Sequence, residues 1–93
     1  MELVGTDFQI KVWTELKKIP TGEVRTYKQI AESIGHPRSS RAVANACGKN
    51  PYLRLIPCHR VIRSDGRLGG YSGEGGTFEK MKLLIQEGVL TSD

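Results

Sequence analysis

Apolar residues near the start of the chain recur at three- and four-residue intervals, the spacing of one helix face. They are Phe8, Val12, Trp13, Leu16 and Ile19. Thr6 and Gln9 stand at the start of this run with the spacing of a capping box, in which each side chain accepts a hydrogen bond from the other residue's backbone N–H. We therefore expect a helix over residues 7–18 that ends before Pro20, with Trp13 anchored in the core.

A second helical pattern follows and is formed by Tyr27, Ile30, Ala31 and Ile34. It predicts a helix over residues 26–34 that ends at Gly35, because glycine readily takes the left-handed conformation found just after many helices. A serine at position 39 or 40 can cap a third helix, Arg41–Cys47, which Gly48 closes. Two short helices joined by a tight turn indicate a helix-turn-helix, although an ordinary helical hairpin has the same pattern.

The remaining pattern predicts a β-hairpin and a last helix. Val61–Arg63 is a short apolar strand, residues 64–66 form a Ser-Asp-Gly turn, and Arg67–Leu68 would return beside the strand. Residues 77–87 predict a helix whose inner face carries Phe78, Met81, Leu84 and Ile85. The fold class that follows is mainly α: a small winged-helix-like helix-turn-helix domain with a short β-hairpin, one domain over residues 1–93.

The positive charge is concentrated in the middle of the chain. The 93 residues have a net charge of +4, but residues 36–72 carry seven basic residues against Asp65, a local charge of +6. Six of these seven are arginine, whose planar guanidinium suits phosphate. A solvated surface would have the same composition, yet this segregation favours a polyanionic partner.

Several functional classes lack support in the sequence. No apolar run approaches the roughly 18 residues of a membrane helix, and the first residues lack the basic and apolar parts of a signal peptide. We expect Cys47 and Cys58 to be reduced and the protein to be cytoplasmic, or associated with the nucleoid or nucleus through DNA. The cysteines and histidines fit no paired zinc-ligand spacing. The glycine-rich residues 69–76 match neither of the nucleotide-binding motifs G-x-G-x-x-G and G-x-x-x-x-G-K-[ST]. We therefore expect no metal and no cofactor.

The candidate chemistry lies in the run Pro57-Cys58-His59-Arg60-Val61. A cysteine reacts as the thiolate, so it needs a nearby base or positive charge. His59 can be the base and Arg60 adds a permanent charge. Neighbouring side chains on a strand point in opposite directions, so a water molecule or a sharp turn would have to link Cys58 to His59. The five residues alone leave a buried structural cysteine as an equal alternative.

Short motifs along the whole chain, taken in order, extend this interpretation. They are Gly5-Thr6-x-Phe8-Gln9, Val12-Trp13, Ile19-Pro20-x-Gly22-Glu23-Val24, Thr26-Tyr27, Arg41-Ala42-Val43, Asn50-Pro51, Ile56-Pro57-Cys58-His59-Arg60-Val61, Gly70-Tyr71-Ser72-Gly73 and Leu84 to Gly88. In this order they resemble the C-terminal, active-site domain of O(6)-alkylguanine-DNA alkyltransferases. The resemblance implies DNA repair by single-turnover, stoichiometric transfer of an alkyl group from O(6)-alkylguanine in DNA to Cys58, without a cofactor.

The resemblance also implies roles for individual residues at the site of transfer. Cys58 would be the nucleophile, and His59 the base that acts on it through a water molecule. Glu87 would orient the histidine, as in a Cys-His-acid triad, and Asn50 would brace the active-site turn. Three residues are expected to border the substrate pocket: Val61, Tyr71 and Ser72.

Other matching residues would handle DNA. Such proteins rotate the target nucleotide out of the duplex, because stacking hides the alkyl group. Tyr27 would crowd the backbone phosphate to drive this rotation, and Arg41 would fill the vacated stack. Three further arginines are expected to contact DNA: Arg60, Arg63 and Arg67. The expected partner is double-stranded DNA containing O(6)-alkylguanine, bound by a monomer that has no membrane association.

The chain departs from the family pattern in two ways. We expect the N-terminal domain that the family usually has to be absent, and residues 74–76 lengthen the segment after the Tyr71-Ser72-Gly73 motif. Short alkyltransferase-like proteins resemble the same domain but carry another residue in place of the cysteine. Such a non-catalytic module, which binds alkylated DNA and recruits other repair proteins, is the alternative function; fusion to a larger repair protein also stays open. A winged-helix regulator ranks last, because it leaves Cys58 and His59 unexplained.

Overall fold

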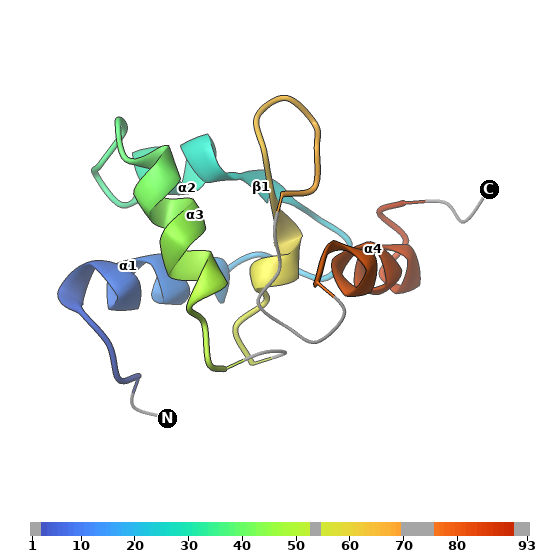
Figure 1. Cartoon of the computed structure of the whole chain (residues 1–93), viewed down its shortest axis with the longest axis horizontal. Helices are drawn as coiled ribbons and strands as arrows, with labels where there is room; N and C mark the ends of the chain where they lie inside the picture. The colour runs from blue at the N-terminus through green and yellow to red at the C-terminus, as the bar shows by residue number, and fades with distance from the viewer. Residues whose placement is uncertain (1–2, 53–54, 70–75, 91–93) are drawn as a thin grey trace.

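The computed structural model describes residues 3–52, 55–69 and 76–90. Its elements in chain order are α1 (Asp7–Leu16), β1 (Arg25–Thr26), α2 (Tyr27–Ser33), α3 (Ser40–Gly48), the 3-10 helix η1 (Cys58–Arg60), β2 (Val61–Ile62) and α4 (Gly76–Gln86). In Figure 1, α1, α2 and α3 are grouped on one side and α4 lies on the other, with η1 between them. The mainly helical fold predicted from the sequence is confirmed.

The capping box predicted at the start of α1 is present. Thr6 Oγ1 accepts a hydrogen bond from the backbone N–H of Gln9 (3.1 Å), and Gln9 Oε1 accepts one from the N–H of Thr6 (2.9 Å). The helix ends at Leu16, two residues earlier than predicted, because the N–H groups of Lys18 and Ile19 bond three residues back and tighten the chain. Trp13 is a core anchor, 2% exposed, and its Nε1 donates to the Ala46 carbonyl in α3 (3.0 Å).

The boundaries of α2 follow from its own local bonds. Thr26 and Gln29 form a second capping box, with hydrogen bonds of 2.8 and 3.0 Å. The helix ends where Gly35 takes a φ of +82° and the N–H of His36 bonds back to the carbonyl of Ala31 (2.8 Å). This is the glycine-dependent ending predicted from the sequence.

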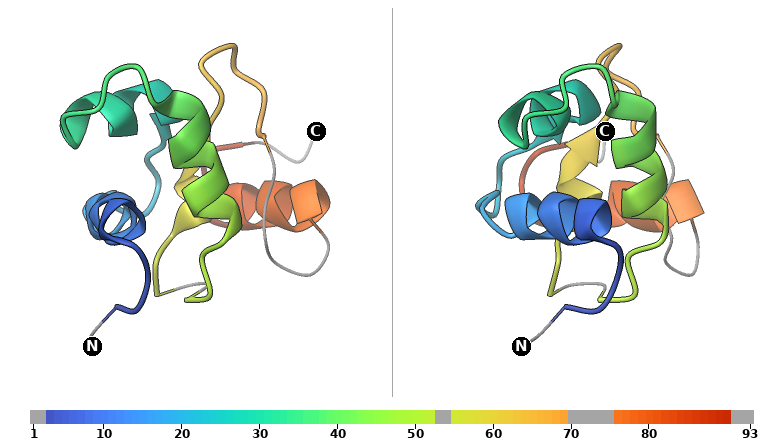
Figure 2. Two further views of the ribbon diagram at one scale, coloured as in Figure 1. Left: turned by 60° about the vertical axis from the view of Figure 1, so that its left-hand side comes forward. Right: turned by 90° about the vertical axis from the view of Figure 1, so that its left-hand side faces the viewer.

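α3 completes the helix-turn-helix. It begins at Ser40 and ends at Gly48, so it is one residue longer at each end than predicted. Its buried face consists of Val43, Ala46 and Cys47. These small side chains let α3 pack against both α1 and α2. Figure 2 shows the turn between α2 and α3 at one end of the molecule.

The predicted β-hairpin is wrong in its pairing. A turn does occur over residues 63–67, where the N–H of Arg63 donates to the Arg67 carbonyl (2.8 Å). The described chain after this turn forms no strand, however. β2 instead pairs in parallel with β1, so that Val61 lies opposite Arg25. The turn is a local signal, whereas a distant two-residue strand leaves no pattern from which its pairing could be predicted.

The inner face of α4 also differs from the prediction. The helix lies within one residue of the predicted bounds, and Gly88 follows it with a φ of +81°. Its buried side chains are Lys80 and Leu84, while Phe78, predicted to face inward, is 64% exposed. The helix is rotated relative to its apolar pattern because Lys80 has hydrogen-bond partners in the interior.

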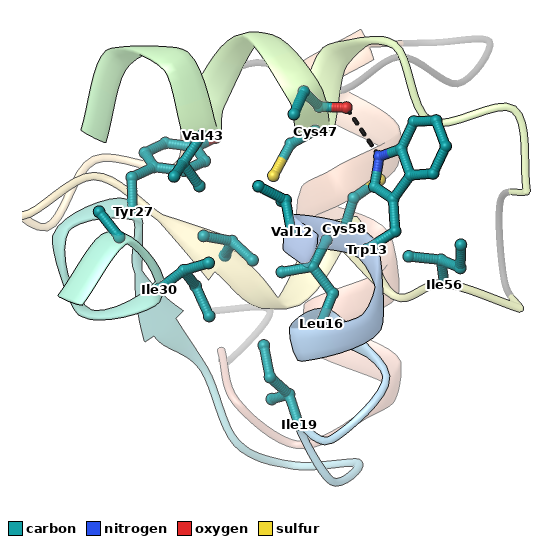
Figure 3. Close-up of a cluster of buried hydrophobic side chains, with 13 residues drawn as sticks. Val12, Trp13, Leu16, Ile19, Tyr27, Ile30, Val43, Cys47, Ile56 and Cys58 are labelled. Atoms are coloured by element: carbon teal, nitrogen blue, oxygen red, sulfur yellow. Dashed lines mark hydrogen bonds between the residues drawn. The ribbon is translucent and has the colours of Figure 1, made fainter. Parts of the chain in front are cut away.

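One apolar cluster joins α1, α2, α3, η1 and β2, as Figure 3 shows. Its buried members are Val12, Trp13, Leu16, Ile19, Tyr27, Ile30, Ala31, Val43, Ala46, Cys47, Ile56, Cys58 and Val61. The two cysteines therefore lie in the core, and no disulfide joins them. Among the described helices, none is both long and apolar enough to cross a membrane.

Candidate active site

Cys58 is the first residue of η1 and is only 3% exposed. Its backbone N–H donates to the carbonyl of Ile56 (2.8 Å), which makes a tight turn before the thiol. Asn50, itself 4% exposed, holds the same segment: Nδ2 donates to the Ile56 carbonyl (2.9 Å), and Oδ1 accepts from the N–H of Tyr52 (2.8 Å). The buried amide thus satisfies backbone groups of Tyr52 and Ile56 and fixes the chain that leads to Cys58.

His59 is held by a carboxylate that follows α4. Its Nε2 lies 2.7 Å from Oε2 of Glu87, and the ring is 4% exposed. Hydrogen bonds from Arg60, and to a smaller extent from His59, lower the pKa of Glu87 to about 2. This carboxylate is therefore an anion that can only accept hydrogen bonds. Nε2 must then carry the shared proton, which leaves Nδ1 of a neutral ring as an acceptor. Nδ1 is buried and has no hydrogen-bond partner in the described part of the chain, as suits a base.

Arg60 binds Glu87 through two parallel hydrogen bonds. Nε donates to Oε1 and Nη2 donates to Oε2, each at 2.9 Å. Nη1 donates to the carbonyl of Ile19 (2.8 Å), and Nη2 also donates to Oγ1 of Thr21 (2.9 Å). The side chain is 15% exposed. These contacts direct Arg60 inward, contrary to the sequence-based expectation that it contacts DNA, because a carboxylate and a carbonyl already engage its planar guanidinium.

Cys47 is a second thiol in the core, but its environment disfavours ionisation. Burial raises the pKa of Cys47 to about 12, with a further contribution from the neighbouring Cys58. It therefore remains a thiol near neutral pH and a poor nucleophile. Figure 3 shows both cysteines within the same cluster, on α3 and η1 respectively. The structure thus separates a structural cysteine from the one that adjoins His59.

Tyr27 lies at the start of α2 and is 8% exposed. Burial raises the pKa of Tyr27 to about 12, so it keeps its phenolic proton. The ammonium of Lys80 lies 3.3 Å from the hydroxyl of Tyr27. Sequence reasoning did not consider Lys80, and the only available signal was its position four residues before the buried Leu84.

The residues expected to border the substrate pocket are described only in part. Tyr71 and Ser72 lie outside the described residues. Val61, in β2, is fully buried in the core, so the whole residue lies beneath the surface. As for metals, the described chain contains no group of three His, Cys, Asp or Glu side chains placed to hold an ion.

Three arginines on the surface remain candidates for DNA contacts. Arg41 is exposed at the second position of α3. Arg63 and Arg67 flank the turn after β2, with side chains 52% and 78% exposed, and both face Asp65 at 3.1 and 3.9 Å. Figures 1 and 2 show residues 63–68 protruding at the same end of the molecule as the turn between α2 and α3. The helix-turn-helix and these arginines can therefore meet one partner together.

Comparisons with known proteins agree with this geometry. The family model for the 6-O-methylguanine DNA methyltransferase, DNA binding domain, matches residues 7–89. A methylated-DNA–protein-cysteine methyltransferase of Methanosarcina barkeri is 54% identical over 86 residues, which cover 92% of this chain and 54% of that protein. The chain thus spans about half the length of such curated relatives.

Two solved structures are similar in fold as well as in sequence. Mycobacterium tuberculosis OGT in complex with DNA has a TM-score of 0.88 at 50% identity, over 92% of this chain and 52% of that chain. Atl1 of S. pombe, in complex with damaged DNA containing O6-carboxymethylguanine, has a TM-score of 0.71 at 32% identity. That match covers 92% of this chain and 80% of the Atl1 chain.

Proposed function

The chain belongs to the 6-O-methylguanine DNA methyltransferase family, and we propose that it repairs DNA by moving the alkyl group of O(6)-alkylguanine onto Cys58. The observation that carries this proposal is the chain of contacts from Arg60 through Glu87 to the buried ring of His59, the residue that follows Cys58. It supplies a base with a fixed tautomer beside a thiol, which is what a cysteine nucleophile needs.

The proposed reaction begins with a proton transfer. Nδ1 of His59 takes the proton of the Cys58 thiol through one water molecule, and the Glu87 anion stabilises the imidazolium that forms. The thiolate attacks the alkyl carbon, so that an S–C bond forms while the bond from that carbon to O(6) breaks. The electron pair of the broken bond goes to guanine, which takes up a proton. A thioether has no easy leaving route, so each molecule reacts once and needs no cofactor.

The target carbon is hidden in a stacked duplex, so the nucleotide must first be rotated out. We assign Arg41, exposed at the start of α3, to filling the vacated stack, and Tyr27 to crowding the phosphate. Arg63 and Arg67 would contact phosphates from the turn after β2. By the family resemblance, the pocket that receives the base would be bordered by Tyr71 and Ser72, with Val61 buried in β2.

The proposed partner is double-stranded DNA that contains O(6)-alkylguanine, bound by one protein molecule in the cytoplasm. OGT of M. tuberculosis was crystallised with DNA and Atl1 with damaged DNA, which supports a DNA partner for the same fold. We propose for Arg60 a positioning role through Glu87 in place of a DNA contact, because its guanidinium already has protein partners.

The alternative is a non-catalytic module, which the comparisons do not favour, because the curated relatives are named methyltransferases. In this alternative the protein would bind alkylated DNA and recruit other repair proteins without transferring the alkyl group. The presence of Cys58 beside a histidine that a carboxylate orients favours transfer, since binding alone requires neither group.

The stoichiometry of lesion removal separates the two candidates. The protein is mixed with a large excess of duplex that contains a single O(6)-methylguanine, and the lesions that remain are counted. We expect each protein molecule to remove one lesion and then stop. Cys58→Ser should remove none, while Cys47→Ser should match the wild type. Tight binding of the damaged duplex by the wild type without any removal would support the non-catalytic module.

A further inference from the structure

Asp65 is the only acidic residue between positions 36 and 72, a stretch that carries seven basic residues. It lies in the turn after β2, midway in sequence between Arg63 and Arg67, and its side chain is 46% exposed. This turn protrudes at the same end of the molecule as the turn between α2 and α3 (Figures 1 and 2). The most basic section of the chain therefore presents a carboxylate where we expect it to meet DNA.

One carboxylate oxygen of Asp65 shapes the turn. Oδ1 accepts a hydrogen bond from the backbone N–H of Arg67 (3.0 Å). Two backbone bonds close the same turn: the N–H of Arg63 donates to the Arg67 carbonyl (2.8 Å), and the N–H of Gly66 donates to the Arg63 carbonyl (3.0 Å). Asparagine supplies such a side-chain acceptor as well as aspartate does, and serine supplies it more weakly. The turn thus needs an oxygen at position 65 but no charge.

The other oxygen faces the two arginines. Oδ2 lies 3.1 Å from Nη2 of Arg63 and 3.9 Å from Nε of Arg67. The backbone N–H of Arg67, followed by the charges of both guanidinium groups, lowers the pKa of Asp65, so the carboxyl is an anion at neutral pH. Water screens these exposed pairs, so they contribute little to the stability of the fold. The charge of Asp65 therefore acts mainly on the two guanidinium groups.

Next to a duplex, this charge opposes binding in two ways. It repels the phosphates, and it pairs with guanidinium groups whose planar donors would otherwise suit a phosphate. Residues 63–67 carry a net charge of +1, which would be +2 without the carboxylate. Because the pairs with Asp65 are exposed and weak, a phosphate can displace the carboxylate. Binding to DNA is then weaker than two unpaired arginines would make it.

We propose that Asp65 restrains the binding of undamaged DNA, because its carboxylate competes with backbone phosphates for the guanidinium groups of Arg63 and Arg67. This inference rests on the proposed function, since it takes DNA as the partner of the two arginines. Phosphate contacts are made without regard to sequence, so the restraint acts at every site. It lets a protein that reacts only once leave undamaged sites quickly while it searches for a rare lesion.

The test measures the affinity for an undamaged duplex over a range of salt concentrations. Asp65→Ser removes the charge and keeps a hydroxyl that can accept from the N–H of Arg67. The matched control is Asp7→Ser, because Asp7 is also exposed but lies in the first turn of α1, away from the turn after β2. Both changes raise the net charge of the protein by one, so they differ in where the charge is removed.

Freeing one guanidinium for a phosphate should steepen the log–log salt slope by about 0.9, which makes binding about eightfold tighter at 0.1 M salt than this contact's absence at 1 M would give. Asp7→Ser should keep the wild-type slope. Asp65→Glu restores the charge and should return the slope to that of the wild type. Unchanged or weaker binding by folded Asp65→Ser would overturn the inference, as would equal tightening by Asp7→Ser.

A competition assay shows whether the restraint affects repair. Methyl transfer from a short duplex containing one O(6)-methylguanine is timed with and without undamaged DNA, added at the dissociation constant of the wild type. By mass action the competitor should reduce the wild-type rate to about half, whereas eightfold tighter binding should slow Asp65→Ser about ninefold. Equal slowing of the two proteins would contradict the restraint on repair.

Two further measurements keep the result interpretable. Circular dichroism follows folding, and if Asp65→Ser does not fold, Asp65→Asn decides the question, because asparagine keeps the side-chain acceptor of the turn. Arg63→Ala and Arg67→Ala test the DNA contacts themselves. An unchanged salt slope in both would speak against the DNA contacts assigned under the proposed function. A reduced slope in either, together with an unchanged slope in Asp65→Ser, would overturn the role of Asp65 alone.

Discussion

Replacing Glu87 with glutamine should destabilise the protein strongly, although the residue lies at a helix end near the surface. Glutamine has the same size, so the change removes the charge and leaves the volume. The carboxylate accepts hydrogen bonds from His59 and Arg60 at 2.7–2.9 Å and is 14% exposed. A glutamine offers only one carbonyl oxygen, so the guanidinium of Arg60 would lose both a hydrogen bond and its counter-charge.

The expected loss in the free energy of unfolding is about 3 kcal/mol. Removing one partner of a buried ion pair costs about 3–5 kcal/mol, because the other charge is left uncompensated. We take the lower end, since Arg60 is 15% exposed and keeps its hydrogen bonds to Ile19 and Thr21. For a domain of this size, each kcal/mol moves the thermal midpoint by about 4–8 °C, so Glu87→Gln should lower it by roughly 12–24 °C.

The loss of stability in Glu87→Gln should also depend on pH and become smaller in acid. The pKa of Glu87 in the folded protein is about 2, below its ordinary value of 4.5. The unfolded state therefore binds this proton more readily than the folded state. The stability that Glu87 contributes is fully present above about pH 4.5 and is lost as the pH falls towards 2. Wild type and Glu87→Gln should differ most near neutral pH and converge in acid.

Urea unfolding, followed by the fluorescence of the buried Trp13, measures this difference. Glu23→Gln is the matched control, because Glu23 also meets an arginine, at 3.0 Å from Arg25, but with side chains 53% and 39% exposed. An exposed pair of this kind contributes about 1 kcal/mol or less. Equal small losses in both variants would refute the reasoning, as would a difference between wild type and Glu87→Gln that persists near pH 2.

The remaining predictions concern DNA. Arg41→Ala should react almost normally with free O(6)-benzylguanine but slowly with damaged duplex, because only the duplex requires base extrusion; equal losses on both would contradict its role. The affinity for undamaged duplex should vary little with sequence and fall with salt, with a log–log slope of about −3 to −5 from binding titrations. Removing Arg63 or Arg67 should reduce that slope by about one if the residue touches a phosphate. A flat salt dependence, or a strong preference for one undamaged sequence, would favour a winged-helix regulator.

Interactions between near neighbours in sequence were predictable. The capping box of Thr6 and Gln9 and the ending of α2 at Gly35 involve hydrogen bonds between residues at most five positions apart, so the residue types alone indicate them. The same is true of the turn after β2. The buried position of Trp13 followed from helical spacing, because its neighbours on that face are also apolar.

Contacts between distant segments were not predictable in the same way. The pairing of β2 with β1 depends on a strand of only two residues, and the burial of Lys80 depends on Tyr27 and Leu68, which no helical pattern reveals. The direction of Arg60 is set by Glu87, which lies 27 positions further along. Glu87 entered the candidate site only through the family resemblance, since spacing alone gives no reason to join it to His59.

The most direct test of the account is the mass of the intact protein after incubation with excess duplex containing one O(6)-methylguanine. We predict a gain of one methyl group, about 14 Da, as a single-use thiolate nucleophile requires. Peptide mapping should place it on Cys58 and not on Cys47, whose raised pKa keeps it protonated. An unchanged mass, a methyl group on Cys47, or continued lesion removal by protein that has already reacted would contradict the account.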